Sequence, residues 1–327
     1  MTEIVAVDIG GTNARFTIAT VNDDGTIDLG EVVTLPTHEH ASLRSAWEAF
    51  ATRAGRPLPR AAGISFAGPV ESQVLKLTNS PWMLRQDALD GELGLDAHVI
   101  VNDFAAVAYA VSRLRPEDLR HICGPDESLP ADGLISILGP GTGLGVAQLL
   151  RVDGAVHVIA TEGGHVDWAP LDPLEDRILA RLREKFRRVS VERLVSGPGL
   201  ANIHEALAAI EGRALVPIED TALWRLALTN EDVLAAAALD RFCLTLGAVA
   251  GDLALAHGAV ATVIGGGVGL RVADALPSSG FPGRYVAKGR FERHMTGLPV
   301  RLITHPQPGL LGAATAFAEL QADRARA

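Results

Sequence analysis

Residues 3–20 of this 327-residue chain read EIVAVDIGGTNARFTIAT, two apolar segments joined by a run of small and polar residues. The β-branched residues of 3–9 predict a buried strand, and residues 15–20 predict a second strand directly after the glycine turn. A turn cluster at 22–25 precedes a third short strand around 31–34. The chain is therefore expected to open with three antiparallel strands.

The same order of elements returns in the second half of the chain. Residues 134–138 predict a buried strand that ends in a second glycine turn, Gly139–Gly145, and further strands are expected over 146–151 and 155–160. Helices are expected over 42–54, 104–114, 173–188, 231–257 and 268–276, and buried strands over 61–66, 98–101 and 260–264. The pattern indicates two copies of one α/β unit, each opening on a glycine turn.

Composition limits the class of protein. The length suggests about two domains, and an apolar fraction of 48% with 21% charged residues is typical of a globular protein. A net charge of -10 without a basic cluster argues against binding of nucleic acid or of an anionic membrane. Two cysteines exclude a disulfide framework and a zinc site built mainly from thiolates, and they favour a reducing, cytoplasmic setting.

Neither a secretory signal nor a membrane span is predicted. The first residues lack the basic start and apolar core of a signal peptide. The uncharged stretches 133–150 and 253–270 each contain several glycines, so they are expected to form strands and turns.

The first glycine turn has the composition of a phosphate site. Gly10 and Gly11 allow a ligand to approach the backbone closely, and Thr12 and Asn13 add hydrogen-bond donors for phosphate oxygens. Asp8, at the end of the strand, would hold a hydrated Mg²⁺ that neutralises phosphate charge. The alternative is a plain hairpin that uses glycine only for its turn geometry.

A second turn of this kind makes one nucleotide held by both turns the better interpretation. It contains Gly141, Thr142 and Gly143, and it lacks the Gly-Lys-Ser/Thr of a P-loop. A third segment would let a flat ligand such as adenosine lie against the backbone, or would simply start a helix packed closely on a strand; it consists of Gly265, Gly266 and Gly267.

Acidic and amide residues form the expected acceptor side. Asp103 follows a buried strand, where open α/β sheets place ligands, and would accept the proton of an attacking hydroxyl while Asn102 hydrogen-bonds a neighbouring one. Glu162, His165 and Glu192 are further groups suited to a sugar with several hydroxyls. Asp103 can instead cap the next helix, and the others can be ordinary polar residues.

Six motifs in order resemble the bacterial glucokinase family, within the superfamily of hexokinases, actin and chaperone ATPases. They are Asp8–Arg15 (DIGGTNAR), Asn102–Phe104 (NDF), Gly139–Gly145 (GPGTGLG), Glu162–Asp167 (EGGHVD), Ser196–Leu200 (SGPGL) and Pro308–Gly312 (PGLLG). The resemblance runs nearly end to end.

This resemblance implies a two-lobed, ribonuclease-H-like α/β fold of the actin-like ATPase type, with the active site in a cleft between the lobes. It implies that ATP and Mg²⁺ phosphorylate the 6-hydroxyl of glucose, with Asp103 as base and Asn102, Glu162, His165 and Glu192 on the sugar. The turns at 10–13 and 139–143 correspond to its phosphate loops, and glycines 265–267 to its adenosine segment. The small lobe would be 1–110 plus 308–327 and the large lobe 111–307, in a homodimer.

One departure separates the chain from the related repressor-and-kinase group of sugar kinases. Those proteins carry a zinc-binding cysteine cluster after the glycine-histidine motif, whereas Trp168-Ala169-Pro170 stands here. A kinase for another hexose, a non-catalytic sugar sensor and an actin-like filament ATPase remain as alternatives.

Overall fold

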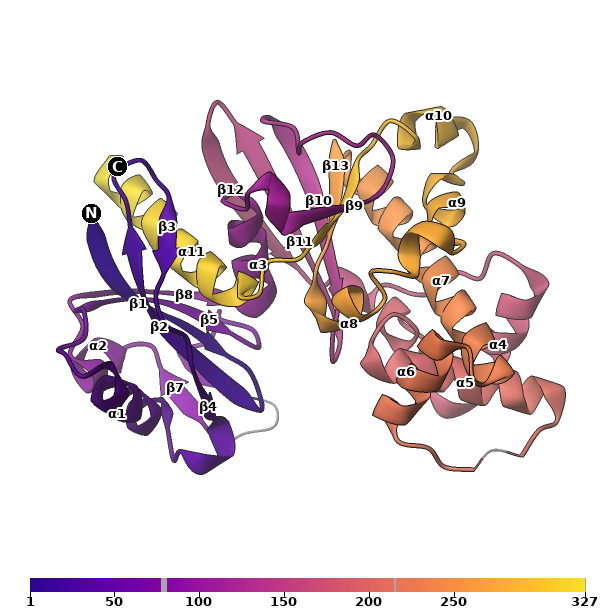
Figure 1. Ribbon diagram of the computed structural model, residues 1–327, viewed down its shortest axis with the longest axis horizontal. Coiled ribbons are helices and arrows are strands. Elements are labelled where there is room, and N and C mark those ends of the chain that lie inside the picture. The colour runs from indigo at the N-terminus through magenta and orange to yellow at the C-terminus, as the bar shows by residue number, and fades with distance from the viewer. Residues whose placement is uncertain (78–80, 215, 327) are drawn as a thin grey trace. The chain divides into compact units, whose positions relative to one another are not determined.

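The protein divides into two compact units, each built around one large sheet. The computed structural model describes residues 1–77, 81–214 and 216–326. Unit 1 comprises Met1–Arg115, Val158–Ala160 and His305–Ala327, and unit 2 comprises Pro116–His157 and Thr161–Thr304. Figure 1 labels the elements of both.

In the residues that the structure describes, unit 1 contains the first sheet and four α-helices. Its strands are β1 (Thr2–Ile9), β2 (Asn13–Val21), β3 (Ile27–Leu29), β4 (Val33–Pro36), β5 (Ala61–Phe66), β6 (Val74–Lys76), β7 (Met83–Arg85) and β8 (Ala97–Asn102). Its helices are α1 (Leu43–Ala54), α2 (Leu89–Leu93), α3 (Asp103–Val111) and α11 (Pro308–Arg326). The sheet has the order β3-β2-β1-β5-β8, with β4 also paired to β2, while β6 and β7 pair separately.

The two faces of this sheet bury different partners. Val5, Val7 and Ile9 alternate along β1 into one cluster with Trp47 and Phe50 of α1. On the other face α11 packs against β1, β5 and α3 (Figure 1). The sheet is thus buried on both sides, which explains the continuous apolar run of β1.

The second sheet repeats the arrangement of the first. Its strands are β9 (Leu119–Cys123), β10 (Gly133–Pro140), β11 (Leu144–Val152), β12 (Ala155–Thr161), β13 (Ala261–Ile264) and β14 (Val300–Ile303), in the order β12-β11-β10-β13-β14-β9. β10 is antiparallel to β11 and parallel to β13, as β1 is antiparallel to β2 and parallel to β5. The predicted duplication of a strand–turn–strand unit is confirmed.

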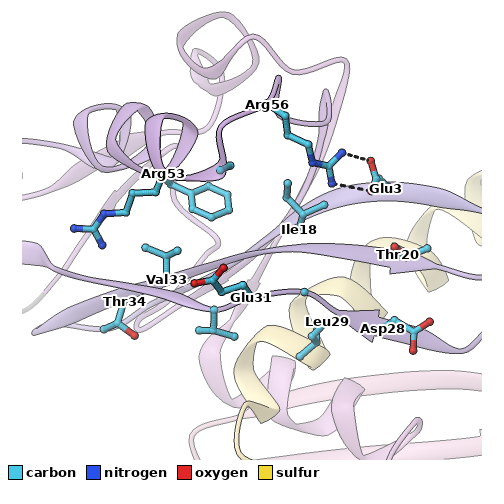
Figure 2. A pocket seen from close by; sticks show the side chains of 14 residues that line it. Glu3, Ile18, Thr20, Asp28, Leu29, Glu31, Val33, Thr34, Arg53 and Arg56 are labelled. Atoms are coloured by element: carbon cyan, nitrogen blue, oxygen red, sulfur yellow. Dashed lines mark hydrogen bonds and ion pairs between the residues drawn. The ribbon is translucent and has the colours of Figure 1, made fainter.

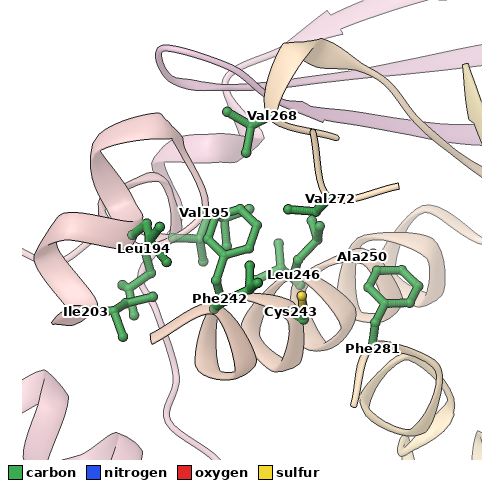
Figure 3. Close-up of a cluster of buried hydrophobic side chains, with 14 of the residues drawn as sticks. Leu194, Val195, Ile203, Phe242, Cys243, Leu246, Ala250, Val268, Val272 and Phe281 are labelled. Carbon is green, nitrogen blue, oxygen red and sulfur yellow. The ribbon is translucent and has the colours of Figure 1, made fainter. Parts of the chain in front are cut away.

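Seven α-helices complete the described part of unit 2. They are α4 (Pro173–Lys185), α5 (Gly197–Glu211), α6 (Asp220–Thr229), α7 (Val233–His257), α8 (Gly266–Arg271), α9 (Phe281–Val286) and α10 (Glu292–Met295). Phe242 and Leu246 of α7 lie in the middle of the apolar cluster, among Val195, Val272 and Phe281 (Figure 3). α7 is long and apolar enough to cross a membrane, but 67% of its most apolar window is buried in the unit, as in a core helix.

Some expected element bounds were wrong. The strand expected around 31–34 overlaps only β4, which begins at Val33, and a separate short strand, β3, precedes it. Both pair with β2, and the chain bulges between them, where the Gly30 amide donates to the carbonyl of Ile18. α4 ends at Lys185 instead of Arg188, since the following residues 189–191 turn back and pair with 166–168. α8 is shorter than expected and begins at Gly266, directly after β13.

Candidate active site

In unit 1 the carboxylate of Asp8 lies at the end of β1, beside the first glycine turn. Ser65 Oγ, on the neighbouring strand β5, donates to Asp8 Oδ1 at 2.8 Å, and Arg15 Nη1 donates to Oδ2 at 3.2 Å. The first turn of α11 packs against the same carboxylate, because a Cβ on Gly309 would lie 2.6 Å from Asp8 Cγ. These contacts hold the Asp8 carboxylate in one orientation.

Asn102 and Asp103 lie at the junction of β8 and α3. Asn102 Oδ1 accepts from the amides of Phe104 at 2.9 Å and Ala105 at 3.3 Å, and its Nδ2 donates to the carbonyl of Gly68 at 3.1 Å. The N-cap of α3 is therefore Asn102, whereas the alternative considered from the sequence was Asp103. One carboxylate oxygen of Asp103 accepts from the Phe104 amide at 2.9 Å.

These residues come together because parallel strands end at the same edge. Asp8 pairs with Ser65 in the β1–β5 register, and Phe66, the next residue, pairs with Asn102 of β8. With neighbouring strands about 4.8 Å apart, Asp8 and Asn102 lie on the order of 10 Å from each other.

The first glycine turn is held by a neighbouring segment. Gly10 N donates to the carbonyl of Asn13 at 2.9 Å, which closes the turn. Thr37 donates its amide to the carbonyl of Thr12 at 2.9 Å and its hydroxyl to that of Gly11 at 2.8 Å. These bonds fix the backbone of the turn, and the side chain of Thr12 at its tip is exposed.

The second glycine turn, between β10 and β11, is held in the same way. Gly141 N donates to the carbonyl of Gly143 at 2.8 Å, and Gly197 N, at the start of α5, donates to the carbonyl of Gly141 at 2.7 Å. Thr142 at the tip is exposed, as Thr12 is in the first turn.

The third glycine segment starts α8 and packs against the second turn. Gly265 is the N-cap, and its amide donates to the carbonyl of Leu138 at 2.9 Å. Gly266 has a φ of +79°, and a Cβ there would lie 2.4 Å from the carbonyl oxygen of Pro140. Only glycine meets both conditions at residue 266, where backbone lies directly on backbone, whereas a Cβ on Gly267 would meet no atom within 4 Å.

Glu162 is the N-cap of the short 3-10 turn η3 (Gly163–His165), and His165 is its last residue. Glu162 Oε2 lies 3.8 Å from His165 Nε2, and the two side chains are 77% and 56% exposed. Arg188, which follows the end of α4 at Lys185, contacts this turn. Its Nη2 donates to the His165 carbonyl at 2.7 Å, and its Nε lies 2.5 Å from Asp167 Oδ1.

Glu192 lies in η4 (Val191–Arg193) and reaches the second glycine turn. Its Oε2 accepts from the amide of Leu144, the first residue of β11, at 2.9 Å. Val191 N donates to the carbonyl of Val166, which joins η4 to the segment after His165. The candidate residues of unit 2 thus gather around the β10–β11 turn.

Comparisons with known proteins now decide the family. The family model described as Glucokinase matches residues 5–320. A glucokinase of Zymomonas mobilis subsp. mobilis is 65% identical over 316 residues, which cover 97% of this chain and 98% of that relative. The chain belongs to the glucokinase family.

Solved structures of glucokinases share the fold. The crystal structure of a glucokinase from an Antarctic psychrotroph superposes with a TM-score of 0.88 at 33% identity, covering 97% of this chain and 99% of the other. A Balamuthia mandrillaris glucokinase in complex with glucose gives 0.77 at 22% identity, covering 97% and 94%. The predicted actin-like ATPase fold class and the prediction of a sugar kinase of this family are confirmed.

Neither a metal-ligating group of three side chains nor a reactive thiol is found in the part of this glucokinase-family chain that the structure describes. Among residues 1–77, 81–214 and 216–326, no three His, Cys, Asp or Glu side chains lie close enough together to ligate a metal ion by themselves. Burial raises the pKa of the Cys123 and Cys243 thiols to about 12, so neither supplies a thiolate nucleophile at neutral pH.

A hollow in unit 1 lies away from the candidate site residues. It has a volume of about 700 Å³ and is lined by β2, β3, β4 and the end of α1, with Ile18 and Val33 inside it (Figure 2). The ion pair of Arg56 with Glu3 lies at its border (Figure 2). Glu3 and Thr20 pair at the opposite end of the β1–β2 ladder from Asp8, so this hollow is separate from the candidate site.

Sequence reasoning missed four residues that support the candidate groups: Ser65, Thr37, Arg188 and Asn202. Ser65 had a signal, since it is a polar residue within an otherwise apolar buried strand. Asn202 Nδ2 donates to the carbonyl of Arg193, next to Glu192, at 2.8 Å. The contacts of Thr37, Arg188 and Asn202 join residues that are 26, 23 and 9 positions apart, and the sequence carries no signal for them.

Proposed function

We propose that this chain transfers the γ-phosphoryl group of ATP to the 6-hydroxyl of glucose. The observation that carries the proposal is the 65% identity, over nearly the whole chain, to a relative named glucokinase. Family membership over residues 5–320 includes every candidate site residue. The arrangement of exposed polar groups beside two glycine turns fits a sugar and a nucleotide.

Each group of residues has a role in this proposal. Asn102, Glu162, His165 and Glu192 hydrogen-bond the sugar hydroxyls, as carboxylate, imidazole and amide groups can. Gly10, Gly11, Thr12 and Asn13 hold phosphate oxygens together with Gly141, Thr142 and Gly143, while Gly265, Gly266 and Gly267 take the adenosine. The exposed threonine at the tip of each phosphate turn supports this assignment.

Asp103 is the base of the reaction. The oxygen of the 6-hydroxyl forms a bond to the γ-phosphorus, the bond from that phosphorus to the bridging oxygen of ADP breaks, and the hydroxyl proton passes to Asp103. Because the transition state of phosphoryl transfer is loose, most of the acceleration comes from positioning and charge stabilisation, and proton removal is late. The bond from the Phe104 amide keeps the Asp103 carboxylate in one orientation.

Asp8 fits the binding of Mg²⁺. A single carboxylate, with phosphate oxygens and water, is a donor set that Mg²⁺ commonly uses. Asp8 supplies that carboxylate beside the first phosphate turn, with its side chain 19% exposed and its oxygens oriented by Ser65 and Arg15. The ion would neutralise charge on the phosphates.

The substitution Asp103→Asn tests the proposal. We expect it to abolish most turnover while glucose affinity stays within several-fold, because the amide keeps the shape and loses the base. ADP release would be measured with glucose, mannose, fructose and N-acetylglucosamine at equal concentration, with Asp274→Asn as control because its side chain is 95% exposed. Turnover like the wild type in Asp103→Asn would remove it from the base role, and a preference for another hexose would change the substrate.

We further propose that the enzyme is a cytoplasmic homodimer, with a small lobe of 1–110 plus 308–327 and a large lobe of 111–307. The low cysteine content supports a reducing compartment. Light scattering coupled to gel filtration tests the dimer, since a monomeric mass at micromolar concentration contradicts it. Limited proteolysis tests the lobes, which predict resistant fragments bounded near residue 110.

A further inference from the structure

The side chain of Glu192 touches the phosphate turn of unit 2 as well as being a candidate for the sugar. Its Oε2 accepts from the Leu144 amide at 2.9 Å. A Cβ added to Gly143 would lie 2.4 Å from that same oxygen and 3.2 Å from Glu192 Cδ. The carboxylate therefore lies directly on the C-terminal half of the turn.

The turn is held at its other half by a residue from the same segment. Gly197 N donates to the carbonyl of Gly141 at 2.7 Å, five residues after Glu192 in the chain. The segment 192–197 thus contacts both halves of the Gly141–Gly143 turn, one by a side chain and one by the backbone. Glycines lose much conformational freedom when a turn is ordered, so such contacts decide how well its amides are pre-oriented.

Glu192 is itself held in place by buried contacts. Asn202, whose exposed fraction is 7%, donates from Nδ2 to the carbonyl of Arg193 at 2.8 Å and accepts at Oδ1 from Lys185 Nζ at 3.0 Å. Val191 N bonds the segment that follows His165. Because the backbone that carries Glu192 is fixed, its carboxylate can restrict the conformations of the Gly141–Gly143 turn.

We propose that Glu192 is a positioning residue for the nucleotide: its carboxylate holds the Gly141–Gly143 turn in the form that binds phosphate. This inference rests on the proposed function in so far as the turn binds the phosphates of ATP. It gives Glu192 a second role, beside its bond to the sugar, and makes one side chain serve both substrates.

Nucleotide binding without sugar tests this role, because no catalysis and no hexose enter the measurement. Calorimetric titration with ADP and with a non-hydrolysable ATP analogue would compare the wild type with Glu192→Gln and Glu192→Ala. We expect Glu192→Ala to bind about tenfold more weakly, the equivalent of one lost charge-assisted hydrogen bond. Glu192→Gln should stay within about threefold of the wild type, since its amide oxygen still accepts from the Leu144 N–H.

Two further variants keep the test decisive. Glu192→Asp, which is one methylene too short to reach Leu144, should weaken nucleotide binding as Glu192→Ala does, and it serves if the alanine variant does not fold. Glu205→Ala removes a half-exposed carboxylate of α5 that bonds Lys185 and should leave nucleotide affinity unchanged.

The outcomes separate this inference from the proposed function. If the wild type binds nucleotide and phosphorylates glucose but Glu192→Ala and Glu192→Asp bind nucleotide as tightly as it does, the inference alone is overturned. Tighter binding by the glutamine and alanine variants would mean that repulsion between the carboxylate and the phosphates dominates, which also overturns it. If the wild type binds nucleotide and phosphorylates no hexose while Glu192→Ala is weakened, the proposed function fails and the inference stands. A wild type that binds no nucleotide overturns both.

Discussion

Asp172 is the centre of a partly buried ionic cluster in unit 2, and its substitution by asparagine is the sharpest stability test. Asp172 Oδ1 caps α4 by accepting from the amides of Leu174 at 3.0 Å and Glu175 at 2.9 Å. Its Oδ2 accepts from Arg241 of α7 and Arg284 of α9, both at 2.7 Å. One carboxylate therefore links three helices.

Asp172→Asn removes the ionic part and keeps the cap. The asparagine oxygen can still accept from the two amides, whereas its NH₂ group faces two guanidinium donors. A hydrogen bond to a charged group contributes about 1.5–3 kcal/mol. Because the arginine side chains are 21% and 17% exposed, solvent screens part of this, and we expect a total loss of about 2–3 kcal/mol. Arg284 Nη2 also donates to Oε1 of Glu175, which is 2% exposed, at 3.2 Å, and we expect this hydrogen bond to remain in the variant.

The assay is urea and thermal unfolding at neutral pH, followed by circular dichroism. For a unit of 150–250 residues the expected loss lowers the melting temperature by roughly 4–12 °C. Glu184→Gln is the matched control, because its ion pair with Arg181 is exposed and should contribute within about 0.5 kcal/mol. An Asp172→Asn protein no less stable than Glu184→Gln would refute the view that this cluster holds the helices together.

The pH dependence of the stability of the wild type and of Asp172→Asn gives a second test of the cluster. Burial raises the pKa of Asp172, but the Glu175 amide and the two arginines outweigh burial, so that the net pKa lies below the ordinary 3.8. A lowered pKa in the folded state means that the contribution is complete above the ordinary value and is lost as the pH falls through the folded one. The difference in the free energy of unfolding between the wild type and Asp172→Asn should be constant above about pH 5 and should become smaller in more acid solution. A difference that widens there contradicts the assigned direction.

Three further predictions concern the supports of the site. Gly312→Val should lower the melting temperature strongly and shift α11, because even a Cβ at this residue would lie inside backbone of α3; an unchanged melting curve would contradict this close packing. Asn202→Asp should raise the KM for glucose several-fold, because the group that donates to the Arg193 carbonyl becomes an acceptor. Lys185→Met, which removes only the donor to Asn202 Oδ1, should leave that KM unchanged. Equal effects of the two substitutions would point to general destabilisation. Ser65→Ala should raise several-fold the Mg²⁺ concentration needed for half-maximal activity, because Asp8 loses the hydrogen bond that the Ser65 hydroxyl donates to it. An unchanged Mg²⁺ concentration for half-maximal activity would show that this hydrogen bond does not affect Mg²⁺ binding.

Much of the fold could be predicted because its signals are local. The buried strand expected over 61–66 is β5 with the same bounds, since an apolar run between turn residues specifies a central strand by itself. The two glycine turns and the strands on either side were also predictable, because their residues bond to neighbours in the chain. Edge elements were harder: β3 and β4 depend on which residues of β2 remain unpaired.

The candidate site, like the fold, has some features that the sequence predicts and others that depend on the tertiary structure. The sequence by itself determined which residue types stand at the strand ends and turns, such as Asp8, Asp103 and the exposed threonines, because strand and turn patterns place them without reference to the rest of the chain. Only the tertiary structure decided that Glu192 meets the amide of Leu144, 48 residues earlier in the chain. A single hydrogen bond cannot close so long a loop, so that contact exists because the packed core of unit 2 brings the two segments together.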